Sequence, residues 1–395
     1  VDLGWEPQWV LVKNADYSGS WVILDSMRGY TVSGVVDNYL FPNSSGAEAT
    51  YDFGAITSTG FTYKNDAVGE NIYMAIRRGP LAPPEAGTEV FSATGWTGNA
   101  TANRFINNSI LTDMIWTKGR SAATGSAVFD RLRGQGNIIQ TEVANAEFAD
   151  TGVLTGLDFN TGFEIQTHSS INDNNATYIS HAWKRAPSYF DCVAYLGNGT
   201  AGRTVSHNLG VAPEMMWVKR RNATGSWMVY HKGLNGGTNP AQYVIYLEDA
   251  QAPDQSSGPW NNTVPASSVF TLGNNNGVNN SSGTYIAFLF ASLDGVSKVG
   301  SYTGNGSTSQ TIDCGFSNGA RFVLIKCTND AENWIVFDSA RGIVSANDPY
   351  LSLNTTDAEN TGSDFVDPAS SGFIVNSNAG EINNSNNTYI FYAIA

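Results

Sequence analysis

The chain has 395 residues, of which 41% are apolar and only 14% are charged, and 35 acidic against 21 basic residues give a net charge of −14. Because a phosphate backbone would repel such a chain, the composition excludes nucleic acid as a main partner. The longest apolar run, residues 285–291, is far shorter than the roughly 20 residues that a membrane helix needs, so we expect no membrane insertion. The length predicts more than one domain.

The composition also predicts almost no helix. Glycine is abundant, with 41 residues, and it stands among many Asn, Ser and Thr residues, which favour turns over helices. The cysteines Cys192, Cys314 and Cys327 are odd in number and lack CxxC spacing, which is untypical of a disulfide framework or a zinc site. We expect all three in cores, although Cys314 and Cys327 could pair if adjacent strands brought them together.

One pattern occurs four times along the chain. An apolar strand ending in lysine occupies residues 9–13, 114–118, 215–219 and 323–326. A second strand, closing on a polar residue, follows at residues 21–25, 126–130, 227–231 and 334–338. Short runs rich in Trp, Tyr, Val and Ile between Gly and Asn clusters are typical of β-sandwiches. The sequence therefore predicts an all-β tandem array of four jelly-roll-like β-sandwich domains, at residues 1–84, 85–187, 188–293 and 294–395.

The aromatic residues that mark each copy are expected in the cores. They are Trp21, Trp227 and Trp334 in the second strand, and Tyr73, Tyr178, Tyr285 and Tyr389 in the terminal strand. Residues 215–219 are apolar at consecutive positions, which indicates central strands buried on both faces. We expect neighbouring copies to stack end to end through short linkers into a semi-rigid rod.

Three of the copies carry the motif D-x-x-R-G after the second strand. Its acid and base are Asp25 with Arg28, Asp130 with Arg133, and Asp338 with Arg341. A catalytic interpretation would require several equivalent active sites in one chain, whereas an Asp–Arg pair that fixes a turn explains the recurrence directly. The third copy has His231, Lys232 and Gly233 in this place, so its turn must be held differently.

The first copy lacks part of the pattern. A glycine-rich turn opens each later copy about 20 residues before the lysine, for example at residues 195–200. Counting back from Lys13 places the opening strand of the first copy before Val1. We therefore expect the first sheet to lack its first strand, and we expect a neighbouring subunit to donate one to the exposed edge.

No constellation of catalytic residues stands out. The histidines His168, His181, His207 and His231 are scattered, and HExxH and P-loop motifs are absent from the sequence, so we expect no catalytic, cofactor or zinc residues. The oxygen-rich loops at residues 172–174 and 364–367 could bind calcium, with solvated loops as the alternative.

Three tryptophans are candidates for glycan contact. Trp5, Trp96 and Trp260 lie in loop-like segments, where an exposed ring can stack on the C–H face of a sugar. Packing in a core or an interface is the alternative for each of them.

The third and fourth copies resemble a known family. The run GNGTAGRTVSHNLGVAPEMMWVKRRNATGSWMVYHKGL, residues 197–234, is similar to repeated domains of marine bacteriophage (cyanophage-type) virion proteins, as are the GNGS, WIVFDSARG and TYI landmarks of the fourth copy. In that family the domains are similar to concanavalin- or laminin-G-like jelly rolls.

The resemblance implies a non-enzymatic structural or adhesive protein at the virion surface or another extracellular site, such as a tail fibre, spike or capsid decoration. Its partners would be other virion proteins, copies of itself and a host cell-surface glycan. A carbohydrate-binding, lectin-like module is the alternative function, and a polysaccharide-degrading enzyme, with two carboxylates across one cleft, is the third.

Overall fold

The computed structural model describes residues 1–32, 36–64, 69–80 and 82–395. The regular structure of these residues is nearly all β-strand, and the paired strands are antiparallel, which confirms the all-β prediction. The helical elements are α1 (Ser169–Asn172), α2 (Asn276–Asn279) and the 3₁₀ turns η1 (Gly87–Glu89), η2 (Leu234–Gly237) and η3 (Pro240–Gln242). Within these ranges, no helix has the length and apolar character required to cross a membrane.

We name the four repeated stretches units 1 to 4, at residues 1–84, 85–187, 188–293 and 294–395. Each of units 2 to 4 has an inner sheet, which is the sheet that faces the other two units. In it the terminal strand lies between the first strand and the lysine strand. In unit 2 the order is β11 (Ala127–Asp130), β10 (Met114–Gly119), β16 (Thr177–Trp183), β8 (Phe91–Thr97). In unit 3 it is β17 (Phe190–Leu196), β24 (Thr284–Phe290), β19 (Met215–Arg220), β20 (Met228–His231), β21 (Tyr243–Tyr246), β22 (Asp254–Gln255). In unit 4 it is β25 (Ser297–Thr303), β32 (Thr388–Ile394), β27 (Phe322–Cys327), β28 (Ile335–Asp338), β29 (Leu351–Ser352).

Smaller sheets form the outer layer of each sandwich. Unit 2 has β14 (Leu154–Gly156), β15 (Gly162–Ile165) and β9 (Arg104–Asn107), with the pair β12 (Asn137–Ile138) and β13 (Phe148–Ala149). Unit 3 has β18 (Arg203–Ser206) and β23 (Val269–Leu272), and unit 4 has β26 (Gln310–Asp313), β31 (Gly372–Val375) and β30 (Val366–Ala369). The three cysteines are buried and free, so they act as small core residues and do not pair.

Unit 1 has a shorter inner sheet, in the order β2 (Val22–Asp25), β1 (Pro7–Asn14), β7 (Asn71–Arg77). Its other pairs are β3 (Asp37–Tyr39) with β4 (Ala49–Tyr51), and β5 (Gly54–Thr57) with β6 (Gly60–Tyr63). Among the described residues, no strand pairs with the second edge of β7, whereas its counterparts β16, β24 and β32 pair with β8, β17 and β25 on that side.

The inner strands of units 2 to 4 bury both faces. In β24, Tyr285 and Leu289 point into the core of unit 3 itself, whereas Phe288 and Phe290 point into a second core that the three units share. Because side chains alternate between the faces of a strand, two apolar faces require consecutive apolar residues. This arrangement explains the unbroken apolar runs in the sequence.

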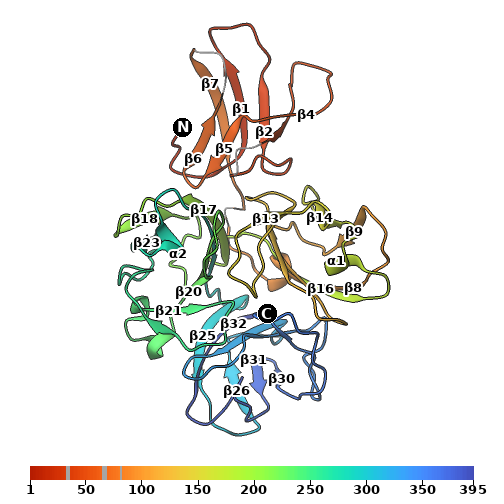
Figure 1. Ribbon diagram of the computed structural model, residues 1–395, viewed down its shortest axis with the longest axis vertical. Helices are drawn as coiled ribbons and strands as arrows, with labels where there is room; N and C mark the ends of the chain where they lie inside the picture. The colour runs from red at the N-terminus through yellow and green to blue at the C-terminus, as the bar shows by residue number, and fades with distance from the viewer. Residues whose placement is uncertain (33–35, 65–68, 81) are drawn as a thin grey trace.

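Units 2, 3 and 4 lie side by side around that shared core (Figure 1). Its large members are Trp116 and Trp183 from unit 2, Trp217 and Phe290 from unit 3, and Trp334 and Tyr392 from unit 4. The expectation of an end-to-end string is therefore wrong for these units. The inner sheet of each unit has a second apolar face that points away from its own sandwich, and only side-by-side packing buries that face. Unit 1 has its own small core and lies at one end of the molecule (Figure 1).

Candidate functional site: the contacts between units

The lysine that ends each repeated strand makes a contact between units. In units 2 to 4 the ammonium donates a hydrogen bond to a backbone carbonyl of another unit: Lys219 to Ala144, Lys326 to Ala250 and Lys118 to Thr355. Unit 3 thus binds unit 2, unit 4 binds unit 3, and unit 2 binds unit 4. Burial lowers the pKa of both Lys219 and Lys326 to about 8, and carbonyl acceptors stabilise the charged form. The three contacts form a closed ring.

The tryptophan of the second strand follows the same direction around the ring. Trp227 donates its indole N–H to the carbonyl of Gln140 in unit 2, at 2.8 Å, and Trp334 donates to Tyr246 in unit 3, at 2.9 Å. Both side chains are buried as expected, but they lie in the shared core and not in their own sandwich. Their position explains why an amphipathic ring is used, since its apolar body fills the core while its N–H reaches a neighbour.

Unit 2 closes the ring by a different route. Ser126 stands where the other two units have tryptophan, and it is too short to reach unit 4. Instead, Trp116 donates to the hydroxyl of Thr141, at 3.2 Å, and that hydroxyl donates to the carbonyl of Leu353 in unit 4, at 2.6 Å.

The Asp–Arg motif does more than fix a turn. In unit 2, Arg133 is buried and pairs with Asp130 as expected, but its Nη1 also donates to Glu147 at 3.0 Å. Glu147 in turn accepts two hydrogen bonds, at 2.8 and 2.9 Å, from Arg221 of unit 3. Burial alone would raise the pKa of Glu147, but Arg221 and Arg133 hold this pKa below its ordinary value. The motif therefore positions a carboxylate that binds the next unit.

Unit 4 repeats this arrangement toward unit 2. Arg341 pairs with Asp338 and lies 3.4 Å from Glu359, which accepts two hydrogen bonds of 2.9 Å from Arg120. Unit 3 lacks the motif, and unit 4 correspondingly has Thr328 where units 2 and 3 have the arginine that would bind it. The motif and its partner are thus absent together.

Buried histidines occupy two of the ring contacts. His181 of unit 2 places Nε2 2.8 Å from Oδ2 of Asp338 in unit 4, and burial lowers the pKa of this histidine against the opposing effect of Asp338. His231 of unit 3 accepts from the backbone N–H of Gly233 and lies 3.3 Å from the carbonyl of Phe391 in unit 4. Burial lowers the pKa of His231 to about 4, so it is neutral at pH 7.

The terminal-strand tyrosines divide between buried and exposed. Tyr178, Tyr285 and Tyr389 are buried as expected, each stacked on an aromatic ring of the first strand, namely Trp96, Tyr195 and Tyr302. Tyr73 is 47% exposed, so the expectation of a core position is wrong, because among the described residues no first strand lies beside β7 to supply that ring. Trp21 is only half-buried for a related reason, since no other unit covers its sheet in the described part of the chain, and its core assignment is wrong too. Asp25 and Arg28 pair at 2.6 Å as expected.

Two of the three glycan candidates are buried and cannot stack on a sugar. Trp96 is 8% exposed and donates to the carbonyl of Ile171, while Trp260 is fully buried and donates to Tyr243. For these two residues the glycan assignment is wrong, because loops close over rings that complete the sandwich cores. Trp5 is half-buried.

The two loops considered for calcium have different roles. Asn172 is fully buried, and its amide holds a loop by donating to the carbonyls of Thr101 and Gln166. Asp364 and Asp367 each keep one carboxylate oxygen without a hydrogen-bond partner among the described residues, and burial together with Asp364 raises the pKa of Asp367. In the described part of the chain, no group of three or more His, Cys, Asp or Glu residues is placed to hold a metal ion.

One constellation in unit 2 has the residue types of a hydrolase triad. Ser170 Oγ lies 2.7 Å from Nδ1 of His168, and Asp150 lies 3.9 Å from the other ring nitrogen, which is too far for a hydrogen bond. The same Nδ1 accepts from the backbone N–H of Ser170 and caps α1, just as Asn275 caps α2 in unit 3. The arrangement is therefore a helix cap.

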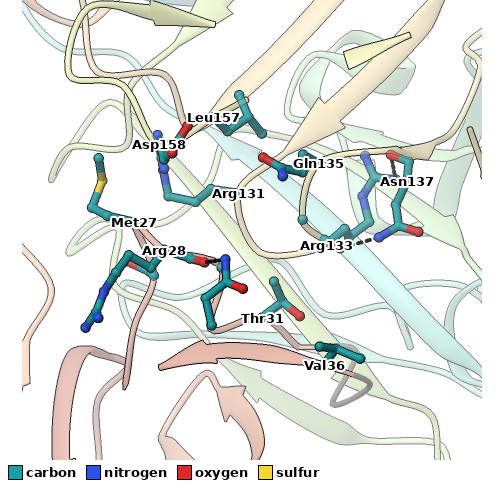
Figure 2. Close-up of a pocket in the computed structure, with 14 residues that line it drawn as sticks. Met27, Arg28, Thr31, Val36, Arg131, Arg133, Gln135, Asn137, Leu157 and Asp158 are labelled. Atoms are coloured by element: carbon teal, nitrogen blue, oxygen red, sulfur yellow. Dashed lines mark hydrogen bonds between the residues drawn. The ribbon is translucent and has the colours of Figure 1, made fainter. Parts of the chain in front are cut away.

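A pocket of about 370 Å³ lies where the D-x-x-R-G turns of units 1 and 2 meet. Figure 2 shows Arg28, Arg131 and Arg133 around it, with Asp158 beside Arg131. Arg28 and Arg133 are paired with the aspartates of their own motifs, and Arg131 lies 3.6 Å from Asp113. The charges that line this pocket are thus largely balanced.

A buried ionic cluster joins unit 1 to the ring. Arg185 donates two hydrogen bonds of 2.6 and 2.7 Å to Glu6 of unit 1 and a third to Asp191. Arg78 of unit 1 lies 3.3 Å from Asp113 of unit 2. Although burial opposes the charge, the two acids raise the pKa of Arg185 well above its ordinary value. Removal of one partner would leave a buried charge uncompensated.

The sequence predicted the repeated lysine, tryptophan and Asp–Arg pairs but not their partners in other units. Glu147 and Glu359 were missed, although the pattern K-x-R at Lys118 with Arg120 and at Lys219 with Arg221 was a usable signal. Backbone carbonyl acceptors leave no trace in a sequence.

The comparisons with known proteins add a family. No curated protein matches this chain, and no solved structure matches it either. A family model described as a domain of unknown function, DUF7483, matches residues 1–80 and 86–395, and the second stretch spans units 2 to 4 except for residue 85. The chain belongs to the DUF7483 family.

Proposed function

We propose that this protein is a non-enzymatic structural or adhesive component of a bacteriophage particle, such as a tail fibre, spike or capsid decoration, that acts at the virion surface. The observation that carries the proposal is the use of the repeated residues. The lysine, the tryptophan and the Asp–Arg pair of the repeat are committed to contacts between units. A repeat that serves assembly fits a building element.

The phage setting comes from the sequence resemblance of units 3 and 4 to marine phage virion domains. Low charge and many short, Asn- and Gly-rich loops on closely packed sandwiches suit an extracellular particle. The lectin alternative is weakened, because Trp96 and Trp260 are buried.

Proteomic analysis of phage particles purified from the source tests the proposal. We expect peptides of this chain at a fixed copy number per particle and antibody labelling on the particle surface by electron microscopy. Recovery of the chain only in the particle-free supernatant would contradict the proposal. Glycan-array binding by such free protein would instead favour the lectin alternative.

A further inference from the structure

We propose that the inner sheet of unit 1 is an interface of the same kind as those between units 2, 3 and 4, and that three copies of this chain assemble through it into a homotrimer. The inference deepens the assembly role proposed above by naming the partner, a second and a third copy of the same chain. It rests on a comparison of this sheet with the three inner sheets that already meet around the shared core.

The sheet of unit 1 presents the same kind of face as its counterparts. The cross-strand row Ile23, Leu11, Met74 corresponds by register to the row Val229, Trp217, Phe288 in unit 3 and to the row Val336, Leu324, Tyr392 in unit 4. The counterpart rows are buried in the shared core. In unit 1 the row is open, and Met74 is 53% exposed between Ile72 and Ile76, which are also exposed.

The polar groups of this face are also those of a ring contact. Lys219 donates three hydrogen bonds, two within its own unit and one to Ala144 of the next. Lys13 also makes two bonds in its own unit, to Asn14, the counterpart of Arg220, and to Tyr17, and these are the only ones among the described residues. One ammonium proton therefore remains for a neighbour.

Trp21 stands where Trp227 and Trp334 donate their indole N–H groups across the ring. In units 2 and 3 the acceptor carbonyls come directly after the residue that pairs with the second strand. In unit 2 this residue is Ile139, which forms a β-bridge with Val128. In unit 1 Leu40 makes the same bridge to Ile23, so the backbone carbonyls of residues 41–45 in the next copy are the counterpart acceptors.

The geometry of the existing ring sets the number of copies. Contacts between units 2, 3 and 4 are head-to-tail and close after three members. Identical copies that use the same face with the same rotation form a closed cyclic trimer. Among the described residues, the inner sheets of units 2 to 4 bury this face against one another, so the face of unit 1 is the one that stays open.

Light scattering after size-exclusion chromatography of the 395-residue chain tests this inference. We expect a mass of about three times 42.3 kDa at micromolar concentration. The variant Met74→Lys should be monomeric, because it would bury a charge in the trimer without a partner. Its circular dichroism spectrum should be unchanged, since the side chain is exposed in the single chain.

Val264→Lys is the matched control, because Val264 is 56% exposed on unit 3, and this variant should remain trimeric. A wild-type chain that stays monomeric or dimeric at every concentration overturns the proposal. So does a trimer that survives Met74→Lys, because it would form through another surface, such as strand addition at the edge of β7. A monomer that is still found in phage particles would overturn the trimer and leave the proposed function standing.

Discussion

At the scale of single residues, the repeat selects side chains that combine an apolar body with one polar tip. Lysine and tryptophan both fill apolar space along their length and place a donor at the end, where a carbonyl of the neighbouring unit accepts it. Because each donor finds an acceptor, burial of these groups leaves no unpaired hydrogen-bonding atom at these points. The contact between units is thus both apolar and directional.

His231 makes the stability of the ring depend on pH. Its folded-state pKa of about 4 is below the ordinary value of 6.5, with burial as the main cause, Lys232 acting in the same direction, and Glu214 and the Phe391 carbonyl opposing it. The stabilisation is fully present above pH 6.5 and is lost as the pH falls from 6.5 toward 4, by on the order of 3 kcal/mol.

The variant His231→Asn isolates this effect, because Asn can accept from the Gly233 N–H and does not titrate. Urea unfolding at pH 7 and pH 4.5 should show a smaller loss of unfolding free energy for the variant than for the wild type. Equal losses in the two proteins would show that His231 does not titrate in this range.

At the scale of elements, the glycine-rich turns mark a close approach between the first strand and the loop that follows α1 in unit 2, α2 in unit 3 and the turn at residues 380–383 in unit 4. A Cβ atom on Gly304 would lie 2.2 Å from the backbone oxygen of Asn384, and Gly197 and Gly98 meet the equivalent oxygens at 2.1 and 2.0 Å. Only glycine allows the backbones to pass so closely. The motif noted in the sequence is therefore a packing requirement.

Gly304→Ala should destabilise the protein by roughly 1–3 kcal/mol, because the backbone must shift to admit the methyl group. Gly19→Ala is the control, since nothing lies within 4 Å of the Cβ position there, and its unfolding free energy should change by less than about 1 kcal/mol. Thermal and urea denaturation measure both. A Gly304→Ala protein as stable as the wild type would show that the loop yields without cost.

The strands were predictable from the sequence, because the local residue pattern determines them. Their burial was not predictable where it depends on a neighbouring strand or unit. Runs rich in Trp, Tyr, Val and Ile between Gly and Asn clusters located the strands, and the unbroken apolar run at residues 215–219 indicated the burial of both faces that β19 shows. The pattern around Tyr73 is the same as that around Tyr389, but only Tyr389 has a first strand beside it. Burial of a repeated residue depends on a neighbour that lies elsewhere in the chain.

At the scale of the whole molecule, units 2, 3 and 4 form a closed ring, and unit 1 lies outside it. Two-faced sheets are compatible with a stack or with a ring, and composition does not distinguish these arrangements. The polar contacts do, since unit 2 binds unit 4 across 239 residues through Arg120 and Glu359. That contact was not predictable from the spacing of the repeats, because a linear array would place these two units apart.

The most direct test of the ring is the coupling energy between Arg120 and Glu359. A double-mutant cycle with Arg120→Ala, Glu359→Ala and the combined variant, measured by urea unfolding, should give a coupling of roughly 1–2 kcal/mol for this partly buried pair. Arg104 of unit 2 donates to Thr97 and makes no contact with Glu359, so the cycle of Arg104→Ala with Glu359→Ala should give a value near zero. A coupling near zero for Arg120 and Glu359 as well would contradict a closed ring of units 2, 3 and 4.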